Sequence, residues 1–455
     1  MTRKKPASVH ITNYYHKSSG GISTVYNRLL EAANRHERKM RLIVPGERDE
    51  QEEVGDFGRI YYIKASRSPV FDRRYRLIMP WQYLREETRI RQILTEEMPD
   101  IIEVAEKYTL SYLAGHIKRG FLKPLNRPMV VHLSCERMDD NLRAFVSHVI
   151  PSGWFARRII GNYVAPMFDY HLANSEYTAS ELRDAVVSKG REHRPGTFQK
   201  YCWSFFNSSA VGFSDRVFVS NCGVDSELFN PARKNEETRR QILAESGFPE
   251  NATVLLYVGR VSPEKNIDLL PKVLRSLVSF FNLDPAKREF RLLIAGDGPQ
   301  TAWLEKELER CAPGKFKLLG HINEAERLAN LYANADIFVH PNPREPFGIG
   351  PLEAMASGTP VIVPNSGGVL SYANDENAWL REAESDDYFA AVMDILNNPE
   401  EQERRVQNAL ETAQLFSWKN STDRMFQLYD ELYETFSSQR TPSYDGELLT
   451  PPLPK

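Results

Sequence analysis

The sequence between residues 337 and 363 reads Ile337-Phe-Val-His-Pro-Asn-Pro-Arg-Glu345-Pro-Phe-Gly-Ile-Gly-Pro-Leu-Glu353-Ala-Met-Ala-Ser-Gly-Thr-Pro-Val361-Ile-Val. An apolar run, a loop with glycines, a second apolar segment and another β-branched run follow one another here. That order is typical of a strand, a turn, a helix and a parallel strand. We therefore expect strands at Ile337–His340 and Val361–Val363, with a helix at Gly350–Ser357 between them.

The same alternation extends outward on both sides. In the C-terminal half we expect strands at Thr253–Val258, Arg291–Ala295 and Phe316–Leu319, and helices at Ile267–Phe281, Thr301–Cys311 and Glu324–Ala333. In the N-terminal half we expect a helix at Ile22–Ala33 and strands at Val9–Thr12, Arg41–Val44, Ile101–Val104, Met129–Leu133, Tyr170–Ala173 and Val217–Val219. Such alternation predicts an α/β protein with parallel sheets covered by helices.

The two sets of strands predict two Rossmann-like domains that face a central cleft. Asn230-Pro231 and the charged stretch after it indicate the joint. We assign residues 1–230 to the N-terminal domain and residues 231–436 to the C-terminal domain, with the last helices free to cross back. Residues 437–455 contain four prolines and predict a flexible tail.

The composition excludes several classes of protein. Of the 455 residues, 41% are hydrophobic and 26% are charged, which is unlike a disordered chain. The four cysteines, Cys135, Cys202, Cys222 and Cys311, lie far apart, which argues against a disulfide scaffold or a cysteine-built zinc site. The start lacks an apolar signal core, and no stretch approaches the roughly 18 apolar residues of a membrane span. We expect a cytoplasmic protein.

Charge is distributed unevenly along the chain. Lys and Arg outnumber Asp and Glu by 34 to 27 over residues 1–230 and are outnumbered 24 to 34 over the rest. An ordinary solvated surface and two domains with different partners explain this equally well. The basic residues match no nucleic-acid motif, so we expect no nucleic-acid partner. An anionic membrane surface or an acidic ligand suits the basic half better.

The pair Glu345 and Glu353 is the strongest functional signal. A strand, a glycine turn and a helix N-terminus form a site for anions and polyols, because free backbone N–H groups point outward there. Glu353, which we expect in the first helical turn, would also suit the helix dipole, and Glu345 would suit a solvated loop. The complete sequence from Glu345 to Val361 is too specific to be explained by these two structural roles alone, and it favours a functional site.

This string resembles the E-x7-E signature of the family-4 retaining glycosyltransferases, which have the GT-B fold. Further segments resemble the same family: Gly20-Gly21, Asn174-Ser175, Cys222-Gly223-Val-Asp225, Val258-Gly-Arg260 through Lys265, Ala295-Gly-Asp-Gly-Pro299 and Gly320-His-Ile322. The resemblance spans most of residues 9–380. It implies a hexosyltransferase that moves a sugar from a UDP- or GDP-hexose to a glycan, a lipid-linked molecule or a small molecule.

The resemblance also implies roles for individual residues. Arg260 and Lys265 would bind the diphosphate, which a planar guanidinium and a compact ammonium suit physically. Glu345 would bind the donor sugar, and Glu353 the ribose hydroxyls. The other donor-binding residues would be Gly20, Gly21, Ile322, Phe347 and Gly348. We expect no metal and no further cofactor, because fixed cations can stabilise the leaving diphosphate.

His132 ends a predicted strand and would be a catalytic residue beside the donor sugar; a packed core histidine is the alternative. We expect His10 in the core, with His16 as an outside candidate. The sequence departs from the family pattern at Cys222, where asparagine is usual, and after His132, which is followed by Leu-Ser-Cys-Glu. These departures put the domain joint and the handling of the acceptor in question.

Two other functions compete with hexosyl transfer. One is a catalytically silent protein of the same fold that binds nucleotide sugars or glycans, and the other, more remote, is an epimerase or phosphorylase. Peripheral contact with an anionic membrane is a further hypothesis. It depends on the mixtures of aromatic residues and arginine at Phe71–Trp81 and Trp154–Ile160, and on the aromatic-rich stretch at 189–214. Ordinary packing, with the arginines in water, explains these segments at least as well.

Overall fold

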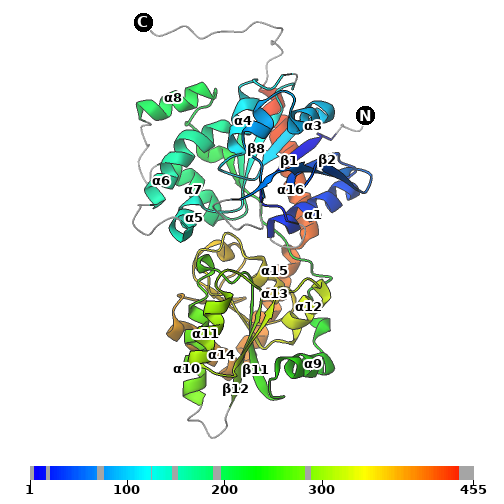
Figure 1. Ribbon diagram of the computed structural model, residues 1–455. Coiled ribbons are helices and arrows are strands. Elements are labelled where there is room, and N and C mark those ends of the chain that lie inside the picture. The colour runs from blue at the N-terminus through cyan, green and yellow to red at the C-terminus, as the bar shows by residue number, and fades with distance from the viewer. Residues whose placement is uncertain are drawn as a thin grey trace.

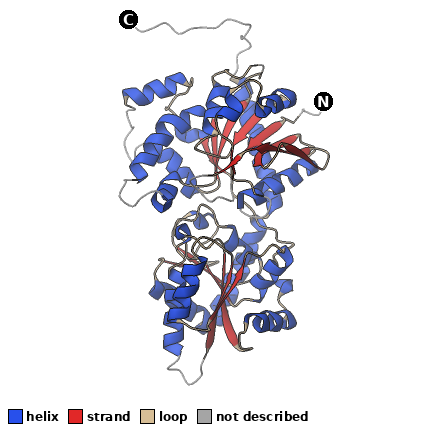
Figure 2. Ribbon diagram, viewed as in Figure 1, coloured by secondary structure: helices blue, strands red, loops and turns tan. Residues whose placement is uncertain are grey.

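The structure, a computed structural model, describes residues 5–16, 21–68, 76–123, 125–145, 152–187, 196–281 and 288–439. It contains two α/β domains, one above the other in Figure 1, and each has a central sheet covered by helices (Figure 2). Among the described residues, no helix is long and apolar enough to cross a membrane. The four cysteines are free thiols.

The N-terminal domain is built on an eight-stranded sheet of order β10-β9-β8-β7-β1-β2-β4-β3. Its strands are β1 (Ser8–Ile11), β2 (Met40–Gly46), β3 (Glu50–Val54), β4 (Gly58–Lys64), β7 (Ile101–Val104), β8 (Met129–Ser134), β9 (Tyr170–Ala173) and β10 (Val217–Val219). All neighbours are parallel except β3, which pairs antiparallel with β4. Strands β5 (Ser66–Arg67) and β6 (Arg76–Leu77) form a separate two-stranded antiparallel sheet.

Helices cover both faces of this sheet (Figure 1). They are α1 (Gly21–Arg35), α2 (Trp81–Leu84), α3 (Arg89–Glu97), α4 (Ser111–Lys118), α5 (Met138–Phe145), α6 (Ser152–Ile159), α7 (Glu176–Val186) and α8 (Thr197–Phe205). Helix α6 continues directly into the π-helical turn η1 (Ile160–Val164). The central strands are buried on both faces, which is why they have continuous apolar runs rather than alternating ones.

The C-terminal domain has a six-stranded parallel sheet of order β13-β12-β11-β14-β15-β16. Its strands are β11 (Ala252–Val258), β12 (Glu289–Ala295), β13 (Phe316–Gly320), β14 (Ile337–Val339), β15 (Val361–Pro364) and β16 (Trp379–Arg381). Its helices are α9 (Glu236–Ser246), α10 (Leu269–Phe281), α11 (Thr301–Cys311), α12 (Ala325–Asn334), α13 (Ile349–Ala356), α14 (Ser385–Asn397) and α15 (Pro399–Leu415), with the short helix η5 (Pro263–Lys265).

Every strand that the sequence predicted is present, with ends shifted by at most a few residues. The prediction missed the hairpin of β3 and β4 and the edge strand β16. Strand β3 has the sequence Glu-Gln-Glu-Glu-Val and is mostly exposed, because it is the last strand of the sheet and faces water. A charged edge strand of this kind carries no apolar signal that a sequence pattern detects.

The last helix, α16 (Trp418–Ser438), returns to the N-terminal domain and packs beside α1. Its Tyr429 hydroxyl donates to the buried carboxylate of Glu103, which also accepts from Tyr26 and contacts His10 Nδ1 at 2.9 Å. His10 is fully buried, so the prediction that it lies in the core is confirmed. The helix extends to Ser438, slightly beyond the predicted start of the tail, and residues 440–455 lie outside the described residues.

The chain passes between the two domains twice, near Val224 and near Ser417. Backbone hydrogen bonds join these two segments. Val224 N–H donates to Phe416 O at 2.8 Å, and Trp418 N–H donates to Val224 O at 3.0 Å. A Cβ on Gly223 would lie 2.7 Å from the Trp418 backbone, so only glycine fits beside this crossing. Cys222, the unusual residue at the joint, is buried, and its carbonyl accepts from Ser421 Oγ at 3.2 Å.

Candidate active site

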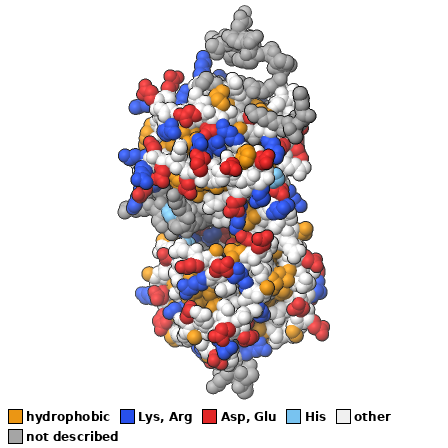
Figure 3. Space-filling view, turned by 90° about the vertical axis from the view of Figure 1, so that its right-hand side faces the viewer, with side chains coloured by type: hydrophobic (Ala, Val, Ile, Leu, Met, Phe, Trp, Pro, Cys, Tyr) orange, Lys and Arg blue, Asp and Glu red, His pale blue; other side chains and the backbone are white. Residues whose placement is uncertain are grey.

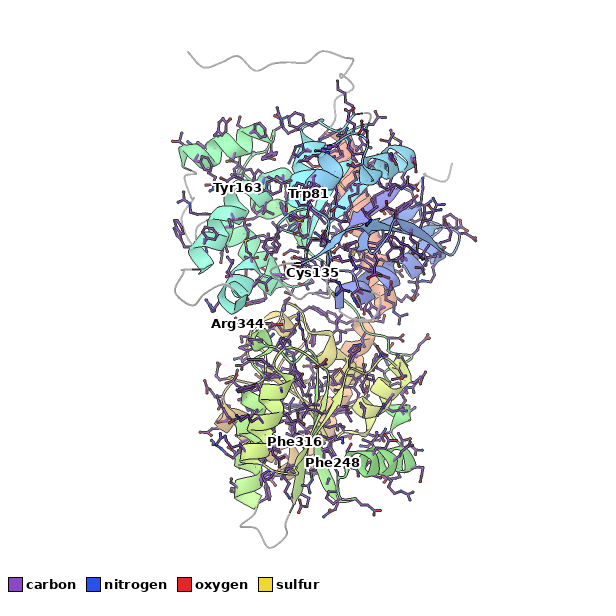
Figure 4. All side chains as sticks on the ribbon, in the orientation of Figure 1. Trp81, Cys135, Tyr163, Phe248, Phe316 and Arg344 are labelled. Atoms are coloured by element: carbon purple, nitrogen blue, oxygen red, sulfur yellow. The ribbon has the colours of Figure 1, made fainter. Side chains whose placement is uncertain are left out.

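The carboxyl ends of the two sheets face each other across the domain boundary. Ser175, just after β9, donates from Oγ to the carbonyl oxygen of Pro346 at 2.5 Å, and Arg344 Nε lies 3.6 Å from Asp140 Oδ1. Figure 4 shows Cys135 at the lower edge of the N-terminal domain and Arg344 at the facing edge of the C-terminal domain. Figure 3 shows the surface hollowed where the two domains meet. Ligands of open α/β sheets bind at such edges.

Lys265 and Glu345 form an ion pair at the edge of the C-terminal sheet. The Lys265 ammonium donates to both carboxylate oxygens of Glu345, at 2.9 and 2.8 Å, and Asn342 Nδ2 donates to Oε2 at 3.0 Å. Burial opposes the ionisation of Glu345, but Lys265, His340 and Asn342 outweigh it and lower the pKa of this carboxyl to about 2. The same burial lowers the pKa of His340 to about 4. Glu345 is therefore ionised and Lys265 is held in place.

A glycine turn supports the loop that carries Arg260 and Lys265. Gly259 N–H donates to Ala295 O at 3.0 Å, and Val261 N–H donates to Asp297 O at 3.2 Å. A Cβ on Gly296 would lie 1.8 Å from Gly259 O, and one on Gly298 would lie 2.2 Å from Val261 O. The glycines of this turn therefore let two backbone segments touch.

Arg260 lies in this supported loop, between β11 and η5, and is half-buried. Its carbonyl oxygen accepts from the Tyr257 hydroxyl at 2.8 Å. Arg260 and Lys265 thus belong to one short segment at the carboxyl end of β11, as the spacing predicted.

Helix α13 begins directly after the Glu345 loop. Its N-cap is Gly348, whose φ of 88° is a left-handed conformation that glycine adopts without strain. Phe347 is buried against Tyr372, with ring centroids 5.2 Å apart, and the Tyr372 hydroxyl donates to Gly348 O. These contacts fix the helix N-terminus, whose free N–H groups attract anions.

Glu353 lies in the second turn of α13, not in the first turn that we expected, because the helix begins at Ile349. Its Oε2 accepts from the Tyr332 hydroxyl at 2.8 Å. Burial raises the pKa of Glu353 to about 7, and Asp225 adds to this effect. The carboxyl is therefore poised between its neutral and ionised forms near neutral pH.

Gly21, at the start of α1, approaches this helix from the other domain. Gly21 is the first residue of α1, and a Cβ there would lie 3.3 Å from Cδ1 of Ile349. Gly20 lies outside the described residues. Ile322 is half-buried in the loop after β13, where it packs against the apolar core.

His132 does not lie with the predicted donor-site residues around Lys265 and Glu345. It is fully buried in β8, with its Nδ1 3.1 Å from Nδ1 of His171 and its ring 5.0 Å from that of Phe168. Burial holds the pKa of His132 well below its usual range, and the neighbouring His171 adds to this effect. The predicted contact with a donor sugar is not open to a side chain in this position, because the strand pleat turns it into the domain interior.

Two glutamates of the N-terminal domain, across the domain boundary from Glu345, were not predicted as site residues. Glu106 and Glu136 are each the second residue after a strand, β7 and β8, at the edge that faces the C-terminal domain. Glu136 accepts from the Tyr14 hydroxyl and from Asn141 Nδ2, both at 2.7 Å. Burial raises the pKa of Glu106 to about 7. The sequence signal that could have identified these two acids is the position of each one just beyond the end of a parallel strand.

A pocket of about 690 Å³ opens at the same edge, over the end of β2. That volume falls within the range of small-molecule sites. Cationic, acidic and aromatic side chains line it, including Tyr15, His16, Tyr62, Arg67 and Arg76. His16 thus lies at a pocket, whereas His10 does not.

Comparisons with known proteins agree with this architecture. The model of the "Glycosyl transferase 4-like domain" matches residues 20–194, and that of "Glycosyl transferases group 1" matches residues 238–412. A D-inositol 3-phosphate glycosyltransferase of Geodermatophilus obscurus is 31% identical over 79% of this chain and 83% of its own length. A GDP-mannose-dependent alpha-(1-6)-phosphatidylinositol dimannoside mannosyltransferase of Mycobacterium tuberculosis is 27% identical over 92% of this chain and 94% of its own length.

Among solved structures, a sucrose-phosphate synthase from Thermosynechococcus elongatus superposes with a TM-score of 0.66, at 19% identity, over 94% of this chain and all of its own. The chain belongs to glycosyltransferase family 4 and has the GT-B fold, as the sequence predicted. It is a glycosyltransferase.

The glycine turn generates a prediction about stability. We expect Gly298→Ala to lower the free energy of unfolding by about 1–3 kcal/mol, because the added Cβ overpacks the site. It should also weaken nucleotide binding, since the Arg260 loop must move. Gly153→Ala, whose Cβ would meet nothing within 4 Å, is the control. Urea unfolding and nucleotide titration measure both effects, and an unaltered Gly298→Ala protein would contradict the supporting role of the turn.

Proposed function

We propose that this glycosyltransferase moves a hexosyl group from a nucleoside diphosphate sugar to its acceptor with retention of anomeric configuration and without a metal ion. The observation that carries the proposal is the ion pair of Lys265 and Glu345 beside the N-terminus of α13. It combines a cation for a diphosphate with a carboxylate for sugar hydroxyls at one cleft edge.

The leaving group sets the main electrostatic requirement. When the bond between the anomeric carbon and the diphosphate oxygen breaks, the diphosphate gains negative charge. Arg260, Lys265 and the N–H groups at the start of α13 would stabilise that charge, because fixed donors need no reorganisation during the reaction. In the proposed retaining step, the acceptor hydroxyl attacks from the face that the diphosphate leaves, and a diphosphate oxygen takes its proton.

Glu345 would orient the donor sugar rather than attack it. Lys265 and Asn342 occupy part of the carboxylate, with two contacts to Oε2 and one to Oε1. A carboxylate has about four acceptor positions, so Oε1 keeps capacity for a sugar hydroxyl. The charge that Lys265 fixes on Glu345 strengthens such a hydrogen bond.

Glu353 would bind the ribose of the nucleotide. Its carboxyl lies on the second turn of α13, and Tyr332 holds it through one oxygen. Tyr332 belongs to α12, in the segment that follows the predicted donor-binding residue Ile322. Two ribose hydroxyls would donate hydrogen bonds to the remaining acceptor positions of this carboxylate.

The acceptor would bind to the N-terminal domain, opposite the donor site. The two relatives described above act, by their names, on D-inositol 3-phosphate and on a phosphatidylinositol dimannoside. The pocket lined by Arg67 and Arg76, and also by Glu47 and Glu50, has the volume for a phosphorylated polyol of that kind. GDP-mannose is the first donor to test. Glu136 would contact the acceptor hydroxyl.

We expect that Arg260→Ala and Lys265→Ala each lower kcat by about 10²–10³-fold, by analogy with the loss of one transition-state donor. Arg310→Ala and Lys272→Ala are matched controls, since both side chains form exposed ion pairs on the same domain. Turnover of the donor with candidate acceptors measures the effect. Folded Arg260 and Lys265 variants with normal kinetics would contradict the donor site and would favour a different location for catalysis.

The pKa of Glu353 generates a prediction about pH. In the free protein the carboxyl is partly protonated near pH 7. Ribose hydroxyls bind the ionised form better, so nucleotide binding should release a proton and tighten as the pH rises from about 6 to 8. The same raised pKa makes this group's contribution to stability fall as the pH rises from about 4.5 through 7.

Calorimetric titration with GDP or UDP in two buffers of different ionisation enthalpy measures the released proton. Glu353→Gln, which cannot ionise, should remove the proton release and the pH dependence. Proton release that is unchanged in Glu353→Gln would assign the effect to another group.

A further inference from the structure

The N-terminal domain carries an aromatic face that the proposed reaction does not use. We define this aromatic face by Phe121, Tyr163, Phe198, Tyr201 and Phe205. On α8, Phe198, Tyr201 and Phe205 have exposed fractions of 52%, 68% and 41%. Positions i, i+3 and i+7 lie on one side of a helix, so these rings form a single outward stripe.

The packing of α8 does not require this stripe. The inner side of the helix is anchored by Trp203, whose Nε1 donates to Gly161 O at 2.8 Å, and by Gln199, whose Nε2 donates to the same oxygen at 3.3 Å. Cys202 is buried beside them. The outward rings keep large exposed fractions. A contiguous exposed apolar face on a folded domain marks an interaction site.

The stripe continues onto neighbouring segments. The rings of Tyr163 and Phe198 lie 6.0 Å apart, and the guanidinium of Arg119 lies 4.9 Å from the ring of Phe205 and 5.6 Å from that of Phe121. Figure 1 shows α5, α6 and α8 along one flank of the domain, with α5 nearest the donor domain, and Figure 4 places Tyr163 on this flank. The aromatic face is thus one surface.

The three segments that carry the aromatic face contain basic but no acidic side chains. The segments 116–123, 152–164 and 196–206 contain no Asp or Glu, and their basic residues are Lys118, Arg119, Lys123, Arg157, Arg158 and Lys200. Lys118 is buried, whereas Arg157, Arg158 and Lys200 are exposed. Arg158 stacks 5.0 Å from the ring of Trp154, which is itself exposed.

We propose that the aromatic face docks on a bilayer surface that contains anionic phospholipids. Tyrosine and tryptophan rings bury their apolar edges at the headgroup level while their polar atoms stay hydrated. Arginine and lysine beside them bind lipid phosphates, and acidic residues that would oppose this are absent from the three segments. The basic half of the chain is the half that docks.

Docking extends the proposed function, since an acceptor carried by a lipid would meet the N-terminal domain at the membrane. It does not depend on turnover, because the aromatic face and the donor residues lie on different domains. A second copy of this chain and an acidic protein are the other possible occupants, and the experiment below separates them from a bilayer.

The experiment is flotation of the full chain with vesicles of phosphatidylcholine alone or with phosphatidylserine. We expect binding to the anionic vesicles at low salt, and a loss of at least about tenfold at high salt. Tyr201→Ser and the charge variant Arg157→Glu/Arg158→Glu should each weaken flotation several-fold. Trp303→Ser, on an exposed ring of the donor domain, should not. Arg260→Ala should float like the unmodified protein, so failure of catalysis and failure of docking are distinguishable.

Absence of flotation with anionic vesicles at low salt would overturn the proposal. So would equal flotation of Tyr201→Ser and the unmodified protein, since a folded variant with a normal far-ultraviolet spectrum would then dock elsewhere. Sedimentation velocity measures whether the chain forms a dimer through this face. A dimer that Tyr201→Ser dissociates, without flotation of the parent, would assign the face to a second copy of the chain and exclude the bilayer.

Discussion

The ion pair of Lys265 and Glu345 is the interaction on which the site depends. A buried carboxylate is costly unless it is paired and hydrogen-bonded, and here an ammonium and an amide provide both. The glycine turn holds the loop that leads to Lys265 against the end of β12. Glu345 stays in place because its loop leads directly into α13 and bonds to Ser175 of the other domain through Pro346. The pair thus connects the sheet edge, the helix N-terminus and the domain boundary.

The two acids of the E-x7-E string show how environment decides chemistry. They lie close together in the chain, yet the pKa of Glu345 is lowered to about 2 and that of Glu353 is raised to about 7. Glu345 faces a cation, whereas Glu353 is buried beside a neutral tyrosine. One carboxylate is a permanent charge, and the other can exchange a proton when a ligand arrives. A single motif therefore supplies two different functional groups.

The sequence predicted the family, both sheets and the positions of Arg260, Lys265 and Glu345 after strand ends because these depend on local signals: apolar runs, glycine turns and acids after strand ends. It was misleading at His132, since a histidine at the end of a strand can point to either face and only packing against His171 and Phe168 decides which. Glu106 and Glu136 escaped because their significance depends on which strands are neighbours, which the chain order does not state. The aromatic stripe on α8 was visible as composition, but its outward direction depends on Trp203 and Gly161.

The central claim is that fixed side chains of this chain, rather than a metal ion, stabilise the departing diphosphate during a retaining transfer. The most direct measurement is an NMR assay of the reaction in excess chelator, with a donor sugar labelled at its anomeric carbon. The account predicts that product forms under these conditions and that its anomeric configuration is the same as that of the donor. An inverted product, or a reaction that stops in chelator and returns only with magnesium or manganese, would contradict it.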